Sequence, residues 1–228
     1  MKHIGILGIT AEGASLCYQT IVSQSARILG ENIHPTITLH TTSFNDILKA
    51  QKDSNWEKVS EICLGSIKVL KNAEADFVII PANSIHYAYD LMKIKSPIPI
   101  LSIVDVVLSE CLEKKYKKVG ILGIGITMSG DLYTKPLEDN DVEAFVPTEE
   151  NQRILNEIIY KEIVLGIKNE ESIRKVVTII QDLKHQGVEA VILGCTELPL
   201  VITEDNSPLP VIDTTTLLAI KAVEKALN

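Results

Sequence analysis

The segments DFVIIPANS at residues 76–84 and EAVILGCTE at residues 189–197 decide the fold, because they repeat one pattern within a single chain. Each is an apolar run with a short polar ending, and the two start at positions 76 and 189, a spacing that we call the repeat offset. Two other pairs of segments match with nearly the same spacing: KHIGILG at 2–8 with KVGILG at 118–123, and IPIL at 98–101 with LPVI at 209–212. The three matches occur in the same order and predict a duplicated α/β unit.

The apolar runs in both halves are continuous and rich in β-branched residues, which is typical of strands buried on both faces of a parallel sheet. Between them, apolar residues recur at the intervals of three and four that favour helices, at residues 56–72, 154–165 and 173–183. Strands that alternate with helices predict right-handed crossovers. We therefore expect an α/β protein of two pseudo-symmetric α/β domains with mostly parallel sheets. The first would span 1–100 with 208–228, the C-terminal segment crossing back, and the second 101–207.

The composition is that of a globular protein with an excess of acidic residues. Hydrophobic residues make up 46% of the 228 positions, which is enough for a substantial core. The formal net charge of −8 offers nucleic-acid phosphates and anionic lipids no general electrostatic attraction, although a local basic patch would remain compatible with it. We expect neither a nucleic acid nor a membrane as a partner.

The sequence favours the reducing cytoplasm. Its first residues, MKHIGILGIT, run directly into a predicted strand and lack the apolar stretch and cleavage-like site of a secretory signal. No segment approaches the roughly 18 apolar residues of a membrane span. The four cysteines lie far apart and form no CxxC pair, which argues against a zinc site or a disulfide framework. Cys17, Cys63 and Cys111 fall within apolar helical spacing and are expected in the core.

Small and polar residues follow four of the predicted strands directly. Ligands of open α/β sheets bind outside the carboxyl ends of the strands, so these clusters are candidate binding residues. Each half contributes two of them, and we expect a small-molecule site in the cleft between the halves. The clusters are Gly8-Ile9-Thr10, Pro81-Ala82-Asn83-Ser84, Gly123 to Thr127, and Gly194-Cys195-Thr196-Glu197.

The chain resembles the aspartate/glutamate racemase superfamily along essentially its whole length. The most specific match is Gly194-Cys195-Thr196-Glu197-Leu198-Pro199, with Pro210-Val211-Ile212-Asp213 downstream. The resemblance implies an active site between two similar domains, racemisation of an acidic amino acid without pyridoxal phosphate, no metal or organic cofactor, and a homodimer. Further matches are Gly5 to Gly8, Pro81 to Ser84 with His86, Val119 to Gly123 with Thr127, and Asn151-Gln152.

The chemistry of racemisation explains why two similar halves are needed. Inverting a stereocentre requires an acid–base group on each face of the α-carbon, and a thiol suits this because its pKa of about 8.5 is lowered by helix N-termini and neighbouring donors. In the family each half supplies one cysteine, and Cys195 matches the second. It follows a predicted strand, where a helix N-terminus would stabilise its thiolate. The alternative role, a small buried hydrophobic residue, stays open.

The first cysteine of the family is replaced by alanine. The family's Pro-Cys-Asn-Thr motif corresponds here to Pro81-Ala82-Asn83-Ser84, and the repeat offset also pairs Ala82 with Cys195. Loss of one general acid or base typically costs roughly 10²–10⁴-fold in rate. Ala82 is an engineered replacement, a natural one with another proton donor, or the mark of a one-thiol enzyme, as in the related arylmalonate decarboxylases. His86 is a candidate substitute acid or base, or a packing residue.

Substrate binding requires donors that stabilise a carbanion next to a carboxylate. Gln51 lies in a stretch that resembles family members accepting both aspartate and glutamate, and either holds a carboxylate or is a solvated helix residue. Where many aspartate racemases have a lysine before Ala-Gly, this chain has Val164-Leu165-Gly166, so that cationic contact is absent. Ordinary loop capping is the alternative for several of the other candidates. These candidates are Gly8, Thr10, Asn83, Ser84, Thr127 and Thr196.

The favoured hypothesis is a cofactor-independent racemase of aspartate or glutamate, impaired or altered because Ala82 replaces one catalytic cysteine. The alternatives are a one-thiol decarboxylase or isomerase of dicarboxylic acids, and a catalytically weak homologue that binds a small molecule. Gly123-Ile124-Gly125 loosely resembles a dinucleotide-binding motif, but the third glycine and the following acidic residue are missing.

Overall fold

The computed structural model describes residues 1–228, and the chain forms two compact units. Unit 1 comprises residues 1–106 and 215–228, and unit 2 comprises residues 107–214. The chain leaves unit 1 within helix α5 (Ile103–Glu113) and returns to it at the start of helix α10 (Thr214–Leu227). The C-terminal helix therefore completes the unit in which the chain begins.

Each unit contains one four-stranded sheet in which all neighbouring strands are parallel. The strand order is β2-β1-β3-β4 in unit 1 and β6-β5-β7-β8 in unit 2, so the second sheet repeats the first with every strand number raised by four. The expected pair of parallel-sheet α/β domains is confirmed. The strands are β1 (Ile4–Gly8), β2 (Ile37–Thr41), β3 (Phe77–Ile79), β4 (Ile100–Leu101), β5 (Lys118–Leu122), β6 (Glu143–Phe145), β7 (Ala190–Leu193) and β8 (Val211–Asp213).

The register of the two sheets matches the internal sequence repeat. Ile4 of β1 pairs with Phe77 of β3, and Val119 of β5 pairs with Ala190 of β7. Ile4 and Val119 occupy equivalent positions in the repeated IGILG and VGILG segments, and the repeat offset relates Phe77 to Ala190. The repeat therefore extends to individual residue pairs, and Ala82 and Cys195 have equivalent positions in the two units.

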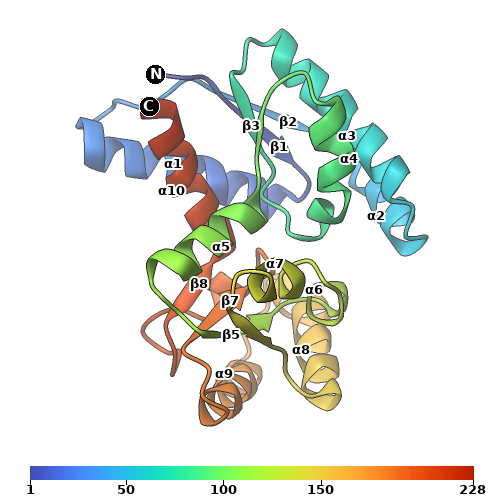
Figure 1. Ribbon diagram of the computed structural model, residues 1–228, viewed down its shortest axis with the longest axis vertical. Coiled ribbons are helices and arrows are strands. Elements are labelled where there is room, and N and C mark those ends of the chain that lie inside the picture. Colours follow the sequence, from blue (N-terminus) through green and yellow to red (C-terminus); the bar gives the residue numbers. More distant parts are fainter. The chain divides into compact units, whose positions relative to one another are not determined.

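Helices cover both faces of the sheet in unit 1 (Figure 1). Helix α1 (Ala11–Leu29) and α10 pack on one face, where Ile4, Ile6 and Phe77 point into a core with Ile21 and Leu218. On the other face, Leu7, Val78 and Ile80 pack in a second core against four helices. These are α2 (Phe44–Lys52), α3 (Trp56–Asn72), the 3₁₀ helix η1 (Ser84–Ala88) and α4 (Tyr89–Lys95).

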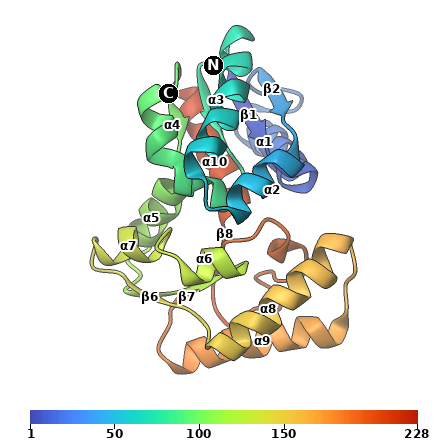
Figure 2. The ribbon, with the colours of Figure 1, turned by 90° about the vertical axis from the view of Figure 1, so that its right-hand side faces the viewer.

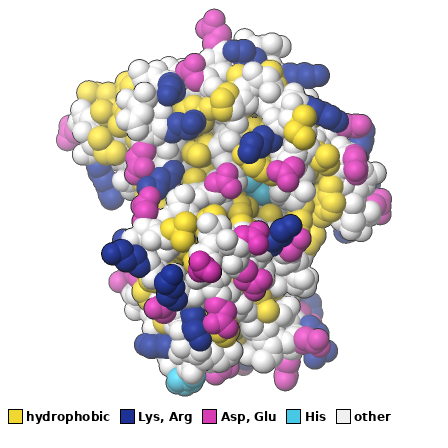
Figure 3. All heavy atoms as spheres, in the orientation of Figure 1, with side chains coloured by type: hydrophobic (Ala, Val, Ile, Leu, Met, Phe, Trp, Pro, Cys, Tyr) yellow, Lys and Arg dark blue, Asp and Glu magenta, His cyan; other side chains and the backbone are white.

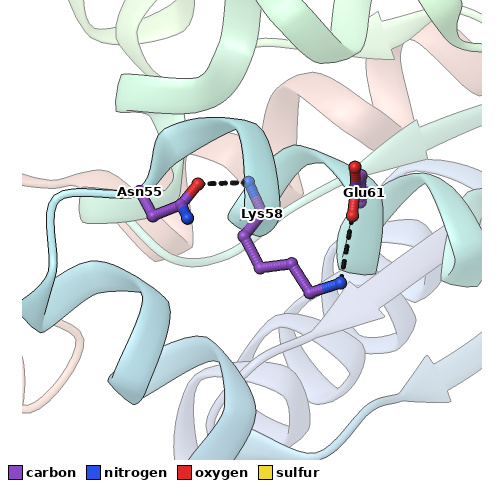
Figure 4. A network of polar contacts seen from close by, with 3 residues as sticks. All are labelled: Asn55, Lys58 and Glu61. Carbon is purple, nitrogen blue, oxygen red and sulfur yellow. Dashed lines mark hydrogen bonds and ion pairs between the residues drawn. The ribbon is translucent and has the colours of Figure 1, made fainter.

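Helix α3 illustrates how local chemistry defines an element. Asn55 is its N-cap, and the Asn55 side chain accepts a hydrogen bond of 2.9 Å from the Lys58 backbone N–H (Figure 4). A cap of this kind contributes about 1 kcal/mol. Lys58 also pairs with Glu61 at 3.0 Å, but both side chains are exposed and such pairs contribute at most about 1 kcal/mol. The apolar spacing predicted a helix over 56–72, and the structure confirms it.

In unit 2, helices α8 (Glu149–Lys161) and α9 (Glu170–His185) lie side by side (Figure 2) and share one core with the sheet. Leu155 and Ile180 are fully buried there against Leu193 of β7. The helix expected at 154–165 begins earlier because the Thr148 side chain caps α8, and it ends at Lys161. The unit also contains α6 (Gly125–Ser129), α7 (Thr134–Glu138), and the 3₁₀ helices η2 (Ile163–Leu165) and η3 (Leu198–Leu200).

The surface carries intermingled charges of both signs, as the visible face in Figure 3 shows. Several exposed pairs one helical turn apart contribute to this pattern, such as Glu157 with Lys161 at 3.1 Å.

No helix is long and apolar enough to cross a membrane. All four cysteines are free, and Cys17, Cys63 and Cys111 are fully buried, as their spacing predicted.

The end of β1 requires a glycine. A Cβ atom on Gly8 would lie 2.8 Å from the Ala14 Cβ on α1 and 3.0 Å from the Thr41 Cγ2 at the end of β2. Contacts this short force the helix or the neighbouring strand to move. Gly8 therefore sets how closely α1 approaches the strand ends of unit 1.

We expect Gly8→Ala to lower the midpoint of thermal unfolding by roughly 2–10 °C, because overpacking costs about 1–3 kcal/mol in a chain of this size. Calorimetry would measure the shift. The matched control is Gly65→Ala on α3, where a Cβ meets no atom within 4 Å and alanine is the better helix former. A midpoint for Gly8→Ala equal to that of this control would refute the packing argument.

Candidate active site

In unit 2, the clusters that follow β5 and β7 lie against each other. The Gly194 N–H donates a hydrogen bond of 2.7 Å to the Leu122 carbonyl, which extends the strand pairing into the loop. A Cβ on Gly194 would lie 2.8 Å from Thr127 Cγ2, and one on Gly123 would lie 3.1 Å from the Gly194 carbonyl oxygen. Glycine at both positions therefore allows this close approach of the two loops. The packing brings Thr127 beside the residue that precedes Cys195.

Cys195 carries a buried thiol bonded to a carboxylate. Its side chain is 8% exposed, and its Sγ–H donates a hydrogen bond of 2.9 Å to Glu197 Oε2. Burial, the charge of Glu197 and this hydrogen bond together raise the pKa of the Cys195 thiol well above its ordinary range. The backbone N–H groups of Glu197 and Leu198 act in the opposite direction but are outweighed. Cys195 is therefore a protonated thiol at neutral pH.

Two titratable groups of unit 2, Glu197 and Tyr160, interact electrostatically with the thiol. Glu197 is buried, with 7% exposure, and takes part in no ion pair. Tyr160 lies on α8, and burial followed by the charges of Cys195 and Glu197 raises the pKa of its phenol. Glu197 belongs to the cluster Gly194-Cys195-Thr196-Glu197 that the sequence analysis singled out. Tyr160 carried no signal, because it belongs to a helix remote in sequence.

The loop after β5 contains a buried hydroxyl without a partner. Thr127 is 1% exposed, and its Oγ1 has no hydrogen-bond partner in the structure. The N-terminus of α6 is bonded to α8, because the Gly125 N–H donates a hydrogen bond of 2.9 Å to Asn156 Oδ1. Thr196 is half-buried beside Cys195. A neighbouring surface pocket of 430 Å³ is lined by Gly125, Ser129, Glu149, Gln152, Arg153 and Asn156.

In unit 1, the structure brings two of the candidate substrate-binding residues together. Gln51, on α2, donates a hydrogen bond of 2.8 Å from Nε2 to Ser84 Oγ at the start of η1. Ala82 is half-buried in the loop after β3, and Asn83 beside it is buried. The one tryptophan of the chain, Trp56, stacks on Tyr87 of η1 with ring centroids 5.0 Å apart. A helix remote in sequence therefore supports this loop.

The cluster after β1 has a structural role in addition to any binding role. Thr10 is the N-cap of α1, and its hydroxyl accepts a hydrogen bond of 3.2 Å from the Gly13 N–H. The hydroxyl proton of Thr10 remains available as a donor, because a hydroxyl both donates and accepts. Gly8 allows the close packing described above. No group of three or more His, Cys, Asp or Glu side chains is placed to hold a metal ion.

His86 holds the Ala82 loop in place. Its Nε2 accepts a hydrogen bond of 3.2 Å from the Ile103 N–H, so the ring proton is on Nδ1. Nδ1 donates a hydrogen bond of 3.0 Å to the Ala82 carbonyl. Burial lowers the pKa of His86 to about 4. The ring is neutral at physiological pH and both nitrogens are engaged. This geometry favours the packing role over that of a substitute acid or base.

The buried neutral His86 makes stability depend on pH in a defined window. The unfolded chain takes up a proton on this ring near pH 6.5, but the folded chain does so only near pH 4. The contribution of His86 to the free energy of unfolding is therefore fully present above pH 6.5. It falls as the pH drops toward 4, by up to about 1.4 kcal/mol per pH unit. We expect His86→Asn to flatten this slope in denaturant titrations, and exposed His34→Asn to preserve it. An unchanged slope in His86→Asn would contradict the assignment.

Comparisons with known proteins agree with this architecture. The solved structure of an aspartate racemase homologue from Pyrococcus horikoshii OT3 is 32% identical, with 100% of both chains covered and a TM-score of 0.89. The aspartate racemase of Picrophilus torridus shares the fold at 21% identity, with 99% of this chain and 94% of that chain covered and a TM-score of 0.78. The broad specificity amino-acid racemase RacX of Bacillus subtilis (strain 168) is 27% identical over 166 residues, which are 72% of this chain and 70% of that protein.

A family model also matches the sequence. It is described as Asp/Glu/Hydantoin racemase, and the match extends over residues 6–222. This range includes all four strand-end clusters and every strand except the first two residues of β1. The chain therefore belongs to the Asp/Glu/Hydantoin racemase family.

Proposed function

We propose that this protein is a cofactor-independent racemase of acidic amino acids, of the aspartate/glutamate type, which transfers the α-proton at Cys195. The observation that carries the proposal is the Cys195 thiol at a strand end, bonded to Glu197 at 2.9 Å, in a member of a racemase family. A broad specificity amino-acid racemase is among its relatives, and an aspartate racemase homologue is among the similar solved structures. The reaction requires a reduced thiol, which suits the cytoplasmic location that the sequence favours. A homodimer is part of the same proposal.

Removal of the α-proton leaves a carbanion whose charge spreads into the α-carboxylate, and hydrogen-bond donors stabilise that charge. In unit 1, the linked amide and hydroxyl of Gln51 and Ser84 are neutral donors suited to a carboxylate. In unit 2, the buried Thr127 hydroxyl has no hydrogen-bond partner, and a ligand that reached it would supply one. The proposed substrate-binding residues are Gly8, Thr10, Gln51, Asn83, Ser84, Thr127 and Thr196.

Ala82 leaves the proposed enzyme with one acid–base thiol where two are expected. The equivalent positions of Ala82 and Cys195 mean that one half has a thiol and the other has none. Racemisation by the two-thiol route would be slow, since one of two general acid–base groups is missing. A protonated Cys195 also suits the second candidate, a one-thiol decarboxylase or isomerase of dicarboxylic acids, in which a thiol protonates a planar intermediate from one face. A catalytically weak binding homologue is the remaining alternative.

Incubation with single enantiomers of aspartate and glutamate in heavy water separates these candidates. Racemisation accompanied by α-deuterium uptake is the expected result for the proposed enzyme. Uptake of deuterium with retention of configuration would indicate exchange on a single face. The absence of both, with a ligand still bound, would refute the racemase proposal. Cys195→Ser is the matched control, in which exchange should fall by roughly 10²–10⁴-fold.

We expect Ala82→Cys to raise the rate of racemisation at least about tenfold, because it restores a thiol at the equivalent position of unit 1. Chiral chromatography of the amino acid would measure this rate. Ala82→Ser is the control, because it adds a hydroxyl oxygen where Ala82→Cys adds the sulfur. Equal rates in the original chain and in Ala82→Cys would exclude position 82 as the site of the missing base.

A further inference from the structure

The two units differ in charge at one equivalent pair of positions. The repeat offset that pairs Ala82 with Cys195 also pairs Ser84 with Glu197. In unit 1, the Ser84 hydroxyl accepts from the neutral Gln51 amide at 2.8 Å. In unit 2, the Glu197 carboxylate accepts from the thiol itself at 2.9 Å. One half therefore presents a neutral pair, and the other presents a thiol and a negative charge.

The Glu197 carboxylate is buried without a compensating cation. Its residue is 7% exposed, and no lysine, arginine or histidine forms an ion pair with it. Removing a carboxylate from water without a partner of opposite charge is costly, and one thiol hydrogen bond offsets only part of that cost. The titratable groups that interact electrostatically with Cys195 in unit 2 are Glu197, on its own loop, and Tyr160, on α8. Neither is cationic.

The adjoining loop after β5 also has an unsatisfied polar group. The Thr127 Cγ2 faces Gly194, the residue before Cys195, and the Thr127 Oγ1 is buried without a partner. A buried hydroxyl without a partner costs about 1–3 kcal/mol, so it favours a ligand that supplies the missing hydrogen bond. An ammonium group carries three donors and a positive charge. It would donate a hydrogen bond to the Glu197 carboxylate and offset its charge.

We propose that Glu197 is the receptor for the α-ammonium group of the substrate and thereby controls the protonation of Cys195. Proton transfer needs the α-carbon about 3–3.5 Å from Sγ, and the ammonium nitrogen is one bond from that carbon. A carboxylate 2.9 Å from Sγ lies within reach of it. In this proposal Glu197 contacts the substrate directly and also controls the thiol. The inference rests on the proposed function. The class of substrate it names is the α-amino acids, as opposed to acids without an amino group.

The pair would then work in two states. Without a ligand, Cys195 donates to Glu197 and remains a thiol, because a thiolate beside the carboxylate would be repelled by it. An ammonium group takes over the hydrogen bond to Glu197 and offsets its charge. The S–H bond then breaks with loss of the proton to solvent, and the thiolate accepts the α-proton as the C–H bond breaks. The reactive thiolate therefore forms only once an amino acid is present, which protects the sulfur from oxidation in the resting protein.

The pH profile of Cys195 alkylation by iodoacetamide tests the control that Glu197 exerts. The other three cysteines are fully buried, and Cys195→Ser identifies the modified residue. Removing a like charge at this distance lowers a pKa by about 1–3 units, so Glu197→Gln should accelerate alkylation at pH 8 at least about tenfold. Glu197→Asp keeps the charge and should retain a profile near that of the original chain. The control Glu157→Gln removes an exposed carboxylate on α8 and should change nothing.

Protection from alkylation tests the ligand class. We expect aspartate and glutamate to protect Cys195 at least about fivefold better than succinate and glutarate, and we expect Glu197→Gln to abolish this difference. Coincident pH profiles for Glu197→Gln and the original chain would overturn the control of the thiol. Equal behaviour of the two ligand classes, including protection by neither, would overturn the ammonium assignment. Neither readout needs turnover, so a protein that fails to racemise still answers both questions.

Discussion

The parallel pairing of β5 with β7 is the constraint on which the candidate site depends. It continues past the strands through the hydrogen bond from the Gly194 N–H to the Leu122 carbonyl, and it brings both carboxyl ends to one edge of the sheet. Glycine at 123 and 194 lets the two loops touch with Thr127 between them. The thiol of Cys195 is therefore placed by backbone hydrogen bonding and close packing, and its chemistry is then adjusted by the side chains around it.

The two units show how one architecture can support different chemistry. Their strand order and register agree, yet the equivalent loops carry a neutral amide–hydroxyl contact in unit 1 and a thiol–carboxylate contact in unit 2. Burial of a carboxylate and a thiol together makes each sensitive to any charge that arrives. A site of this kind responds more strongly to the charge of its ligand than to the ligand's size.

The repeat in the sequence was sufficient to predict the parallel sheets, their equivalence, the helix at 56–72 and the burial of Cys17, Cys63 and Cys111. These features follow from apolar periodicity, which is local. The contact of Gln51 with Ser84 and the electrostatic interaction of Tyr160 with the thiol were not predictable, because they join segments far apart in sequence. The protonated state of Cys195 was also missed, since the helix N-terminus expected to favour the thiolate is outweighed by burial and Glu197. The roles of the candidate binding residues stay predictions.

The stacking of Trp56 on Tyr87 has a practical consequence. The chain contains a single tryptophan, and its indole lies 5.0 Å from the ring of a residue in η1, the short helix that begins at Ser84. Its emission therefore comes from one known location in unit 1. Rearrangement of that helix would change the spectrum of the whole protein, which gives the loop an optical probe without any added label.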